Sequence, residues 1–408
     1  MRILWITNVI FPKLAKELGY AETSLGGWMY SAADILCENK DIQLAVATVY
    51  NGTEIKQYTI DNILYYLLPV KKHITIYDKS LEAYWREIKQ EFCPNVIHLY
   101  GTELPHGLAY LKACGNENVV VSLQGIVNIY SRYYYGNIYW LDILRNPILI
   151  YQKKSFDKSN RNEIEIIKKA QYFEGRSDWD KCIVWSINPM SKYYHCDRTL
   201  RSIFYTKSWS LDRCNKYTIF LSQSSSPIKG IHQLIKALPY ILREYPDVKV
   251  YISGDNMFDN RNIKDKVKYL GYGKYVSTLM KKYNLKNKII FTGSLSETEI
   301  CEMYLKSHVF ICPSSIENVP NSLGEAQILG VPCIASYVGG NAGLIEHGIS
   351  GFLYRFEEYE MLAKYVCDIF GNDSLAKNIS YHGSIQAKGR HNPEKNYKQL
   401  INIYSDIY

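Results

Sequence analysis

Two glutamates, Glu317 and Glu325, are separated by seven residues within the stretch PSSIENVPNSLGEAQILGVPCIASYVGG. The sequence predicts a helix over 323–329, with Asn321 or Ser322 as its N-cap and Glu325 within its first turn. The N-terminus of such a helix presents free N–H groups and the positive end of the helix dipole. The stretch therefore predicts a phosphate-binding helix N-terminus with a carboxylate on either side of it.

Short apolar runs alternate with longer helix-like segments along the rest of the chain. Most runs are rich in β-branched residues and apolar on both faces, which is typical of parallel strands covered by helices. Ligands of such sheets bind beyond the carboxyl ends of the strands. The predicted strands are 2–7, 44–49, 62–68, 95–100, 118–123, 170–174, 217–222, 248–253, 288–293, 308–313 and 332–336.

These strands form two series, which predicts the α/β fold class with two doubly wound, Rossmann-like domains facing each other across a cleft. A length of 408 residues also favours two domains. We expect an N-terminal domain over 1–210 and a C-terminal domain over 211–390, with a linker near 208–216. An amphipathic helix over 391–408 would follow and could cross back to the first domain.

The stretch that contains the two glutamates resembles the signature of glycosyltransferase family 4, the retaining enzymes of GT-B fold. In that signature two glutamates with seven residues between them are followed by G-x-P and then Gly-Gly. Here these elements are Glu317, Glu325, 330–332 and 339–340, and the resemblance extends over 217–351. It implies a nucleotide-sugar donor site in the second domain and an acceptor site in the first.

The resemblance also implies roles for residues of this stretch. Glu325 resembles the carboxylate that binds the ribose hydroxyls of the nucleotide, and Glu317 the one that faces the transferred sugar. An isolated glutamate would more simply be a solvated surface charge or a helix cap. Backbone amides between the two are expected to reach sugar hydroxyls and diphosphate, which makes the donor-binding residues Asn318, Val319, Pro320, Asn321, Ser322 and Leu323.

The family holds the donor diphosphate with an Arg five residues before a Lys-Gly pair. Lys229 and Gly230 match that pair, but Ser224 stands at the position of the Arg. One cation is then missing from the leaving group, where charge stabilisation is usually the largest catalytic effect. Arg176, which follows a predicted strand, is the candidate replacement, with a surface or inter-domain salt bridge as the alternative.

Two positions of the first domain fit the family pattern. Gly26 and Gly27 precede a helix, as in the glycine-rich loop that faces the donor phosphates. Gln124 stands where many relatives carry a His; it can hydrogen-bond a hydroxyl but cannot shuttle a proton near pH 7. We therefore expect the leaving phosphate to take the acceptor proton. In the second domain, Gly293 and Leu295 complete the expected donor site.

Neither a metal nor a cofactor is expected. Asp178-Trp179-Asp180 spells a D-x-D motif, but it opens a predicted helix, where acids favour the helix dipole. His and Cys never cluster at ligand spacing, and the ten cysteines include no C-x-x-C pair, which favours reduced thiols and a cytoplasmic location. His98, on a predicted strand, is expected to be a core residue and Glu103 to point to the rim of the cleft.

The net charge of +8 is spread evenly over both halves. This distribution suits anionic small molecules or an anionic membrane surface and lacks the basic stripe of a nucleic-acid binder. Residues 133–154 are aromatic and apolar and end in two lysines, which favours peripheral contact with the inner face of a membrane over an ordinary buried helix. No apolar run is long enough to predict a membrane span.

The expected function is transfer of a sugar from a nucleotide-diphosphate sugar to a glycan or lipid-linked acceptor in the biosynthesis of a polysaccharide such as a capsule. Two alternatives remain open. One is a nucleotide-sugar epimerase or a phosphorylase on the same fold. The other is a catalytically inactive nucleotide-sugar-binding protein, which Ser224 and Gln124 suggest.

Overall fold

The computed structural model of the protein describes residues 1–20, 27–70, 76–158, 161–254, 258 and 269–408. The chain divides into two compact units, each made of more than one segment. Unit 1 comprises Met1–Asn128, Asp157–Leu200 and Asn392–Tyr408, and unit 2 comprises Ile129–Phe156 and Arg201–His391.

These units differ from the boundaries expected from the sequence in two places. Residues 129–156 group with unit 2, although the chain enters and leaves this segment from unit 1. Residues 201–210 also group with unit 2. Both segments were assigned to the first domain because they precede the expected linker, but the order of residues along the chain does not fix which sheet a segment packs against.

Unit 1 is built on an eight-stranded sheet in the order β3-β4-β2-β1-β5-β6-β7-β8. All of its neighbours pair in parallel except β3 and β4, which are antiparallel. The strands are β1 (Arg2–Ile6), β2 (Gln43–Asn51), β3 (Lys56–Ile60), β4 (Ile63–Val70), β5 (Val96–Tyr100), β6 (Val119–Ser122), β7 (Tyr172–Gly175) and β8 (Lys192–His195).

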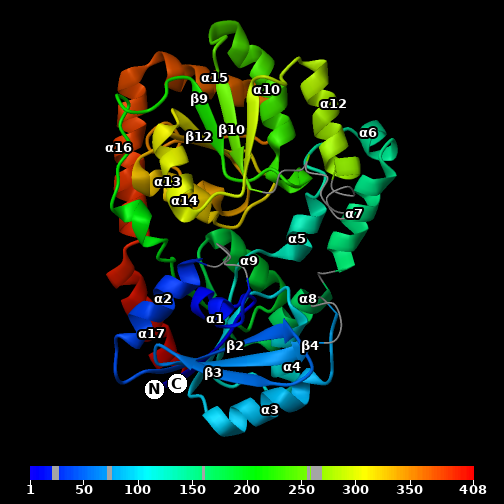
Figure 1. The fold of residues 1–408 in the computed structure, drawn as a ribbon, viewed down its shortest axis with the longest axis vertical. Coiled ribbons are helices and arrows are strands. Elements are labelled where there is room, and N and C mark those ends of the chain that lie inside the picture. The colour runs from blue at the N-terminus through cyan, green and yellow to red at the C-terminus, as the bar shows by residue number, and fades with distance from the viewer. Residues whose placement is uncertain (21–26, 71–75, 159–160, 255–257, 259–268) are drawn as a thin grey trace. The chain divides into compact units, whose positions relative to one another are not determined.

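Both faces of this sheet are buried by helices, as the first strand illustrates. Leu4 and Ile6 pack with side chains of α3, α4, α8 and α9, whereas Ile3 and Trp5 pack with those of α1, α2 and α17. Figure 1 labels these helices. The helices of unit 1 are α1 (Pro12–Glu17), α2 (Gly27–Cys37), α3 (Leu81–Phe92), α4 (Pro105–Cys114), α8 (Arg161–Lys169), α9 (Asp178–Ile187) and α17 (Pro393–Ile407).

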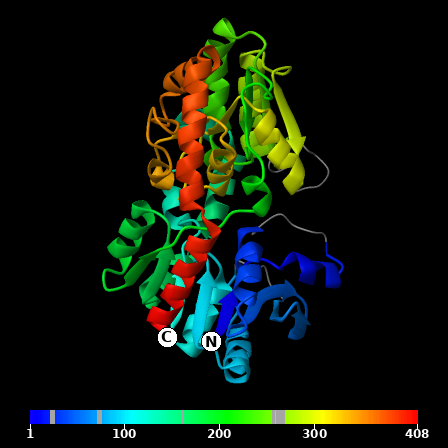
Figure 2. The same cartoon turned by 90° about the vertical axis from the view of Figure 1, so that its left-hand side faces the viewer.

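Helix α17 returns to unit 1 and completes its core next to the N-terminal strand, so both termini lie at the same end of this unit (Figure 2). The buried hydroxyl of Tyr404 accepts a hydrogen bond from Trp5 Nε1 at 3.0 Å and lies 2.7 Å from His98 Nδ1. The other ring nitrogen of His98 lies 3.3 Å from Glu174. His98 is therefore a core residue, as expected.

Residues 129–156 contribute three short helices, which are α5 (Val127–Arg132), α6 (Trp140–Leu144) and α7 (Pro147–Lys158). The first of them begins in unit 1, where the backbone amides of Val127 and Asn128 donate to the carboxylate of Glu163. Burial raises the pKa of Glu163 to about 7, against the lowering effect of these hydrogen bonds. A buried carboxylate of α8 thus fixes the start of α5.

Unit 2 contains a six-stranded parallel sheet in the order β11-β10-β9-β12-β13-β14. Its strands are β9 (Thr218–Leu221), β10 (Lys249–Ser253), β11 (Ile289–Gly293), β12 (Val309–Cys312), β13 (Cys333–Ser336) and β14 (Phe352–Tyr354). Its α-helices besides 129–156 are α10 (Ile231–Glu244), α12 (Lys274–Lys282), α13 (Glu297–Lys306), α14 (Asn321–Leu329), α15 (Tyr359–Gly371) and α16 (Asp373–Arg390).

The two parallel sheets confirm the predicted α/β fold class with two Rossmann-like domains. In unit 2 the chain builds outward from β9 through β10 to β11, and then returns to the other side of β9 to form β12, β13 and β14. The neighbouring strands β9 and β12 therefore send their connections in opposite directions. A crevice for a ligand opens at such a switch point, beyond the carboxyl ends of the strands.

The contacts of Tyr404 give a first prediction. Replacing Tyr404 by Phe leaves the buried indole N–H of Trp5 and the Nδ1 atom of His98 without their partner, which costs about 1–3 kcal/mol. We expect the midpoint of thermal unfolding to fall by about 2–8 °C. Tyr408→Phe, at a residue of the C-terminus that is 70% exposed, is the matched control. Equal midpoints for both variants would contradict the proposed anchoring.

Candidate functional site

The candidate site lies at the switch point of the unit 2 sheet, where two loops leave the neighbouring strands β9 and β12. The first loop ends in a short 3-10 helix, Pro227–Lys229, before α10. The second loop, residues 313–320, leads into α14 and carries Glu317. Lys229 and Glu317 lie 88 positions apart in the sequence, and the sheet order brings them together.

Lys229 and Glu317 form an ion pair that joins the two loops. Lys229 Nζ lies 2.6 Å from Glu317 Oε1, and the same oxygen accepts a hydrogen bond of 2.8 Å from the hydroxyl of Ser314. Burial lowers the pKa of Lys229, but Glu317 raises it by more, so the lysine stays charged. The pair therefore keeps a cation and a carboxylate in the crevice with compensated charge.

Gly230, which follows the lysine, has a structural reason to be glycine. Its φ angle is +68°, and a Cβ atom there would lie 1.7 Å from the carbonyl oxygen of Pro313. The backbone of the first loop thus packs directly on the end of β12. This close approach is what sets Lys229 beside the second loop.

Helix α14 begins earlier than the sequence predicted. Pro320 occupies the N-cap position and Asn321 is the first helical residue, so the prediction of Asn321 or Ser322 as N-cap was wrong. No side-chain hydrogen bond caps this helix and its first turn has no acidic residue. Glu325 is accordingly the fifth residue of the helix and lies in its second turn, not in the first as predicted.

Glu325 is buried on α14 and pairs with a residue that the sequence did not point to. Arg201 Nε and Nη2 donate to the same oxygen, Glu325 Oε1, at 3.0 and 2.8 Å. Burial raises the pKa of Glu325 to about 7, against the lowering effect of the Arg201 charge. The carboxylate is therefore held in a fixed orientation by an arginine 124 positions away in the sequence.

Two of the backbone amides expected to reach a ligand are engaged within the protein. The amide of Asn318 donates to the hydroxyl of Tyr130 at 2.7 Å, and that of Leu323 donates to the carbonyl of Pro320 at 3.1 Å. The side chains of Val319 and Leu323 are buried in the core. For these residues the structure shows packing and internal hydrogen bonds where the sequence suggested ligand contacts.

The segment 129–156 supports this loop from within unit 2. Besides the hydroxyl of Tyr130, the carbonyl of Tyr133 accepts a hydrogen bond of 2.9 Å from Ser315 Oγ. The buried ring of His232 on α10 contacts the carbonyl of Gly136 and lies 2.7 Å from the hydroxyl of Tyr272. Residues inserted between two strands of unit 1 therefore shape the loop that carries Glu317.

The Gly339-Gly340 pair supports the same loop from the other side. A Cβ atom at Gly339 would lie 1.8 Å from the carbonyl oxygen of Glu317, and one at Gly340 would lie 1.9 Å from that of Asn318. The amide of Gly340 donates to the Glu317 carbonyl at 3.0 Å. The two glycines thus allow backbone to pack on backbone.

The remaining donor-site residues of unit 2 lie at the ends of strands. Ser224, in the loop after β9, is buried, and its hydroxyl has no hydrogen-bond partner among the residues that the structure describes. Gly293 ends β11 at the edge of the sheet with a φ angle of +76°, and Leu295 follows it. Ser224 therefore follows a strand at the switch point, whereas Gly293 and Leu295 lie at the edge of the sheet.

The expected site residues of unit 1 also follow its strands. Gln124 comes after β6, and Arg176 comes after β7, directly before Ser177, the N-cap of α9. Arg176 is buried and its charge lowers the pKa of Arg198, which burial lowers further, to about 9. Gly27 is the first residue of α2, whereas Gly26 lies outside the described residues.

Arg198 is a basic residue of unit 1 that the sequence analysis missed. Its guanidinium lies 3.7 Å from the centre of the Trp28 ring, and Nη2 donates to Ser122 Oγ at 3.3 Å and to the carbonyl of Leu123. It thereby ties the segment that follows β8 to the end of β6. No short motif surrounds Arg198, so only the strand order could have indicated its place.

The D-x-D motif and Glu103, which follows β5, have structural partners. Asp180 accepts hydrogen bonds from the backbone of Ser177 and from the hydroxyl of Tyr193, and so completes a capping box for α9. Glu103 accepts from Asn8 at 3.2 Å, and burial raises its pKa. Within the described residues, no group of three or more His, Cys, Asp or Glu side chains could hold a metal ion.

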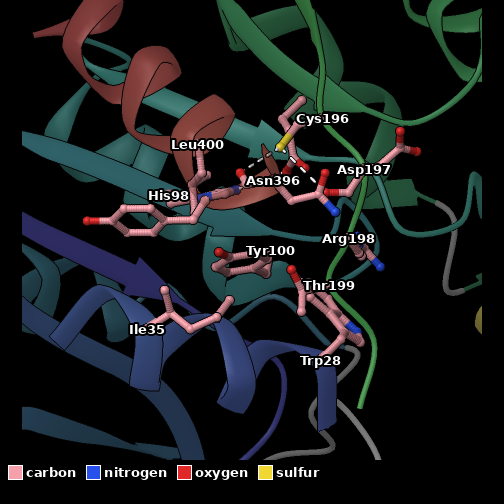
Figure 3. A pocket seen from close by; sticks show the side chains of 13 residues that line it. Trp28, Ile35, His98, Tyr100, Cys196, Asp197, Arg198, Thr199, Asn396 and Leu400 are labelled. Carbon is pink, nitrogen blue, oxygen red and sulfur yellow. Dashed lines mark hydrogen bonds and ion pairs between the residues drawn. The ribbon is translucent and has the colours of Figure 1, made fainter. Parts of the chain in front are cut away.

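A cavity of unit 1 lies between α2, α17 and the ends of β5, β7 and β8 (Figure 3). Its lining includes Trp28, His98, Tyr100, Arg198 and Asn396. The volume of about 40 Å³ has room for a few water molecules, whereas small-molecule sites usually measure about 300–1,000 Å³. The cavity is thus too small for a sugar nucleotide, and we do not assign the site there.

Residues 207–386 match the family model described as Glycosyl transferases group 1. They contain β9 to β14, Lys229, Glu317 and Glu325. This region, 44% of the chain, is similar to group 1 glycosyltransferases. The ion pair at the switch point and the buried glutamate on α14 both lie within it.

Similar proteins include glycosyltransferases. Spore coat protein SA of Bacillus subtilis is 27% identical over 191 residues, 46% of this chain and about half (48%) of that relative. The putative glycosyltransferase YtcC of the same species is 24% identical over 89% of this chain and 83% of its own. The crystal structure of Anabaena Alr3699/HepE with UDP and glucose shares the fold, with a TM-score of 0.69 and 16% identity over 100% of both chains.

The packing of Gly340 in unit 2 gives a second prediction. Gly340→Ala places a Cβ atom against the Asn318 carbonyl, so the loop or the 3-10 helix Gly339–Gly343 must shift. We expect a loss of stability of about 1–3 kcal/mol, seen as a lower midpoint of thermal unfolding. Gly343→Ala, in the same 3-10 helix but with no atom within 4 Å of the added Cβ, is the control. The prediction fails if the two variants unfold at the same temperature.

Proposed function

We propose that the protein transfers a sugar from a nucleotide-diphosphate sugar to a glycan or lipid-linked acceptor in polysaccharide biosynthesis. The observation that carries the proposal is the Lys229–Glu317 ion pair, which places a half-buried cation at the switch point of the parallel sheet. A diphosphate bound there would face Lys229 and the N-terminus of α14, both of which favour negative charge. HepE was crystallised with UDP, which supports uracil as the base.

In this proposal each of the three charged residues, Lys229, Glu317 and Glu325, has one task in the donor site. Lys229 neutralises charge that develops on the diphosphate as the glycosidic bond breaks, and Glu317 turns from the lysine to the transferred sugar. Glu325 accepts hydrogen bonds from the ribose. The amides of Asn318 and Leu323 serve the shape of the loop, because their hydrogen bonds are made within the protein.

We further propose that transfer retains the anomeric configuration and needs no metal ion. The diphosphate that leaves takes the proton of the acceptor hydroxyl, and Gln124 provides a hydrogen bond to a sugar hydroxyl without exchanging a proton. Ser224 supplies a hydroxyl where the family has an Arg, and Arg176 of unit 1 supplies the second cation. Lys229 and the α14 N-terminus provide the positive charge that a metal would supply elsewhere.

Replacing Lys229 tests the donor site. Lys229→Met is expected to slow transfer from UDP-sugar by about 10²–10³-fold, because one charged group is lost where negative charge develops. Proton NMR of the anomeric signal, recorded in EDTA, measures the rate and stereochemistry together. Lys281→Met, at an exposed residue of α12, is the control. An unchanged rate in Lys229→Met would contradict the role of Lys229. An inverted anomer would contradict retention, and loss of wild-type turnover in EDTA would contradict metal independence.

We propose that a lipid-linked acceptor is reached through an exposed aromatic surface of residues 129–156. The surface consists of Tyr133, Tyr139, Trp140, Leu144 and Tyr151, which are each at least half exposed. On α7, Tyr151 shares a helical face with Lys154 and Lys158. Aromatic rings with nearby lysines suit the interface of an anionic membrane. Among the described residues, no helix is both long and apolar enough to span a bilayer.

Sedimentation with vesicles tests this surface. The double variant Trp140→Ser, Tyr151→Ser is expected to bind vesicles of phosphatidylglycerol and phosphatidylcholine about tenfold more weakly than wild type, a change of about 1.4 kcal/mol. Tyr381→Ser, at an equally exposed tyrosine of α16, should bind as wild type does. Wild-type protein that does not sediment with these vesicles would refute membrane contact, whatever the outcome for sugar transfer.

A further inference from the structure

The surroundings of Glu325 raise the question of how a buried carboxylate stays ready to bind a sugar. Glu325 is 5% exposed on α14, and its helix neighbours Leu323, Ala326 and Ile328 are buried apolar residues. An ionised carboxylate accepts hydrogen bonds only, whereas a protonated carboxyl group donates one. Two ribose hydroxyls are both best bound by the ionised form, which an apolar environment disfavours.

Arg201 compensates for this environment in a specific geometry. Two of its N–H groups, on Nε and Nη2, donate to Glu325 Oε1, and Oε2 is not among the atoms that Arg201 contacts. The side chains of the pair are 16% and 7% exposed, so the pair is shielded from water. Two donors on one oxygen anchor that oxygen, and Arg201 leaves the acceptor capacity of Oε2 unused.

Arg201 is itself held in place by aromatic residues. Its guanidinium carbon lies 4.8 Å from the centre of the Phe204 ring, which belongs to the 3-10 helix Ser202–Tyr205. Phe204 packs edge-on against Tyr304 of α13, and the Tyr304 hydroxyl donates to the carbonyl of Ser322 in the first turn of α14. These contacts link Arg201, Phe204 and Tyr304. They connect the 3-10 helix and α13 to the first turn of α14, which precedes Glu325.

The ionisable groups that face Glu325 come from two elements besides α14. Arg201 precedes the 3-10 helix, and Glu297, Cys301 and Tyr304 lie on α13. Burial and the charge of Glu297 raise the pKa of Glu325, whereas Arg201 and Tyr304 lower it, with a net value of about 7. Arg201 is the cation among them, so its removal would shift the carboxyl group further toward the protonated form.

We propose that Arg201 is a positioning residue that holds Glu325 ionised and oriented for the ribose hydroxyls of the donor. The inference rests on the proposed function, because it assumes that Glu325 binds a ribonucleotide. Arg201 acts through Glu325 and does not contact the nucleotide. Its effect is therefore specific for the ribose and differs from that of Lys229, which acts on the diphosphate.

The test compares ribose and deoxyribose ligands. Calorimetry first identifies which of UDP, GDP, ADP and CDP binds the wild-type protein most tightly, and that ligand is then compared with its 2′-deoxy and 3′-deoxy forms. We expect wild type to prefer the ribonucleotide by at least about tenfold, or about 1.4 kcal/mol. In Arg201→Met the preference should fall below about threefold, and Arg201→Lys should restore part of it.

The dependence on pH provides a second readout. Affinity for the ribonucleotide requires the ionised carboxylate, so it should fall as the pH is lowered through the pKa of Glu325. In Arg201→Met this pKa is higher, so the loss of affinity between pH 8 and pH 6 should be larger than in wild type. A purely structural role of Arg201 would lower affinity equally for both sugars and at both pH values.

Two outcomes separate the inference from the function on which it rests. Arg201→Met that binds the ribonucleotide with the wild-type preference and pH profile would overturn the role of Arg201 and leave the proposed function intact. A wild-type protein that binds none of the four nucleotides would overturn both. Arg213→Met, at an exposed arginine, is the control, and Arg201→Gln is the second variant if Arg201→Met does not fold.

Discussion

The Lys229–Glu317 ion pair is the interaction on which the candidate site depends. It joins two loops that leave adjacent strands and then continue in opposite directions, and it adds a side-chain link to the backbone packing of Gly230 on Pro313. Because each charge compensates the other, the crevice can hold both without leaving an unpaired ion in a poorly hydrated place. An entering diphosphate would exchange one anionic partner of the lysine for another.

The sequence predicted well those features that depend on neighbouring residues. Strands with two buried faces, such as β1 and β9, were predicted from their apolar runs, whereas β3 was missed because it alternates between partly and fully exposed residues, and β14 because it has three residues. Contacts over long separations were out of reach. Arg201 pairs with a residue 124 positions away and Tyr130 with one 188 positions away.

The segment 129–156 shows why chain order is an incomplete guide to domains. Its sequence reads as aromatic and apolar, which is compatible with a buried helix or with a membrane surface. In the structure it has both characters, because Tyr134 and Leu149 are buried while Trp140 and Tyr151 are exposed. Its hydrogen bonds to the loop 313–320 mean that one inserted element reaches from an exposed aromatic surface to the backbone beside Glu317.

The return of α17 has a consequence for how the protein is made. The first strand leaves the ribosome early, but Leu400, Ile403 and Tyr404, which complete the packing around Trp5, are translated some 400 residues later. At a synthesis rate of about 5–20 residues per second, this interval lasts tens of seconds. The part of the first sheet that α17 covers therefore stays exposed while the second domain is synthesised, although α1 and α2 can already pack on the same face. This is the period in which a nascent chain would most need a chaperone.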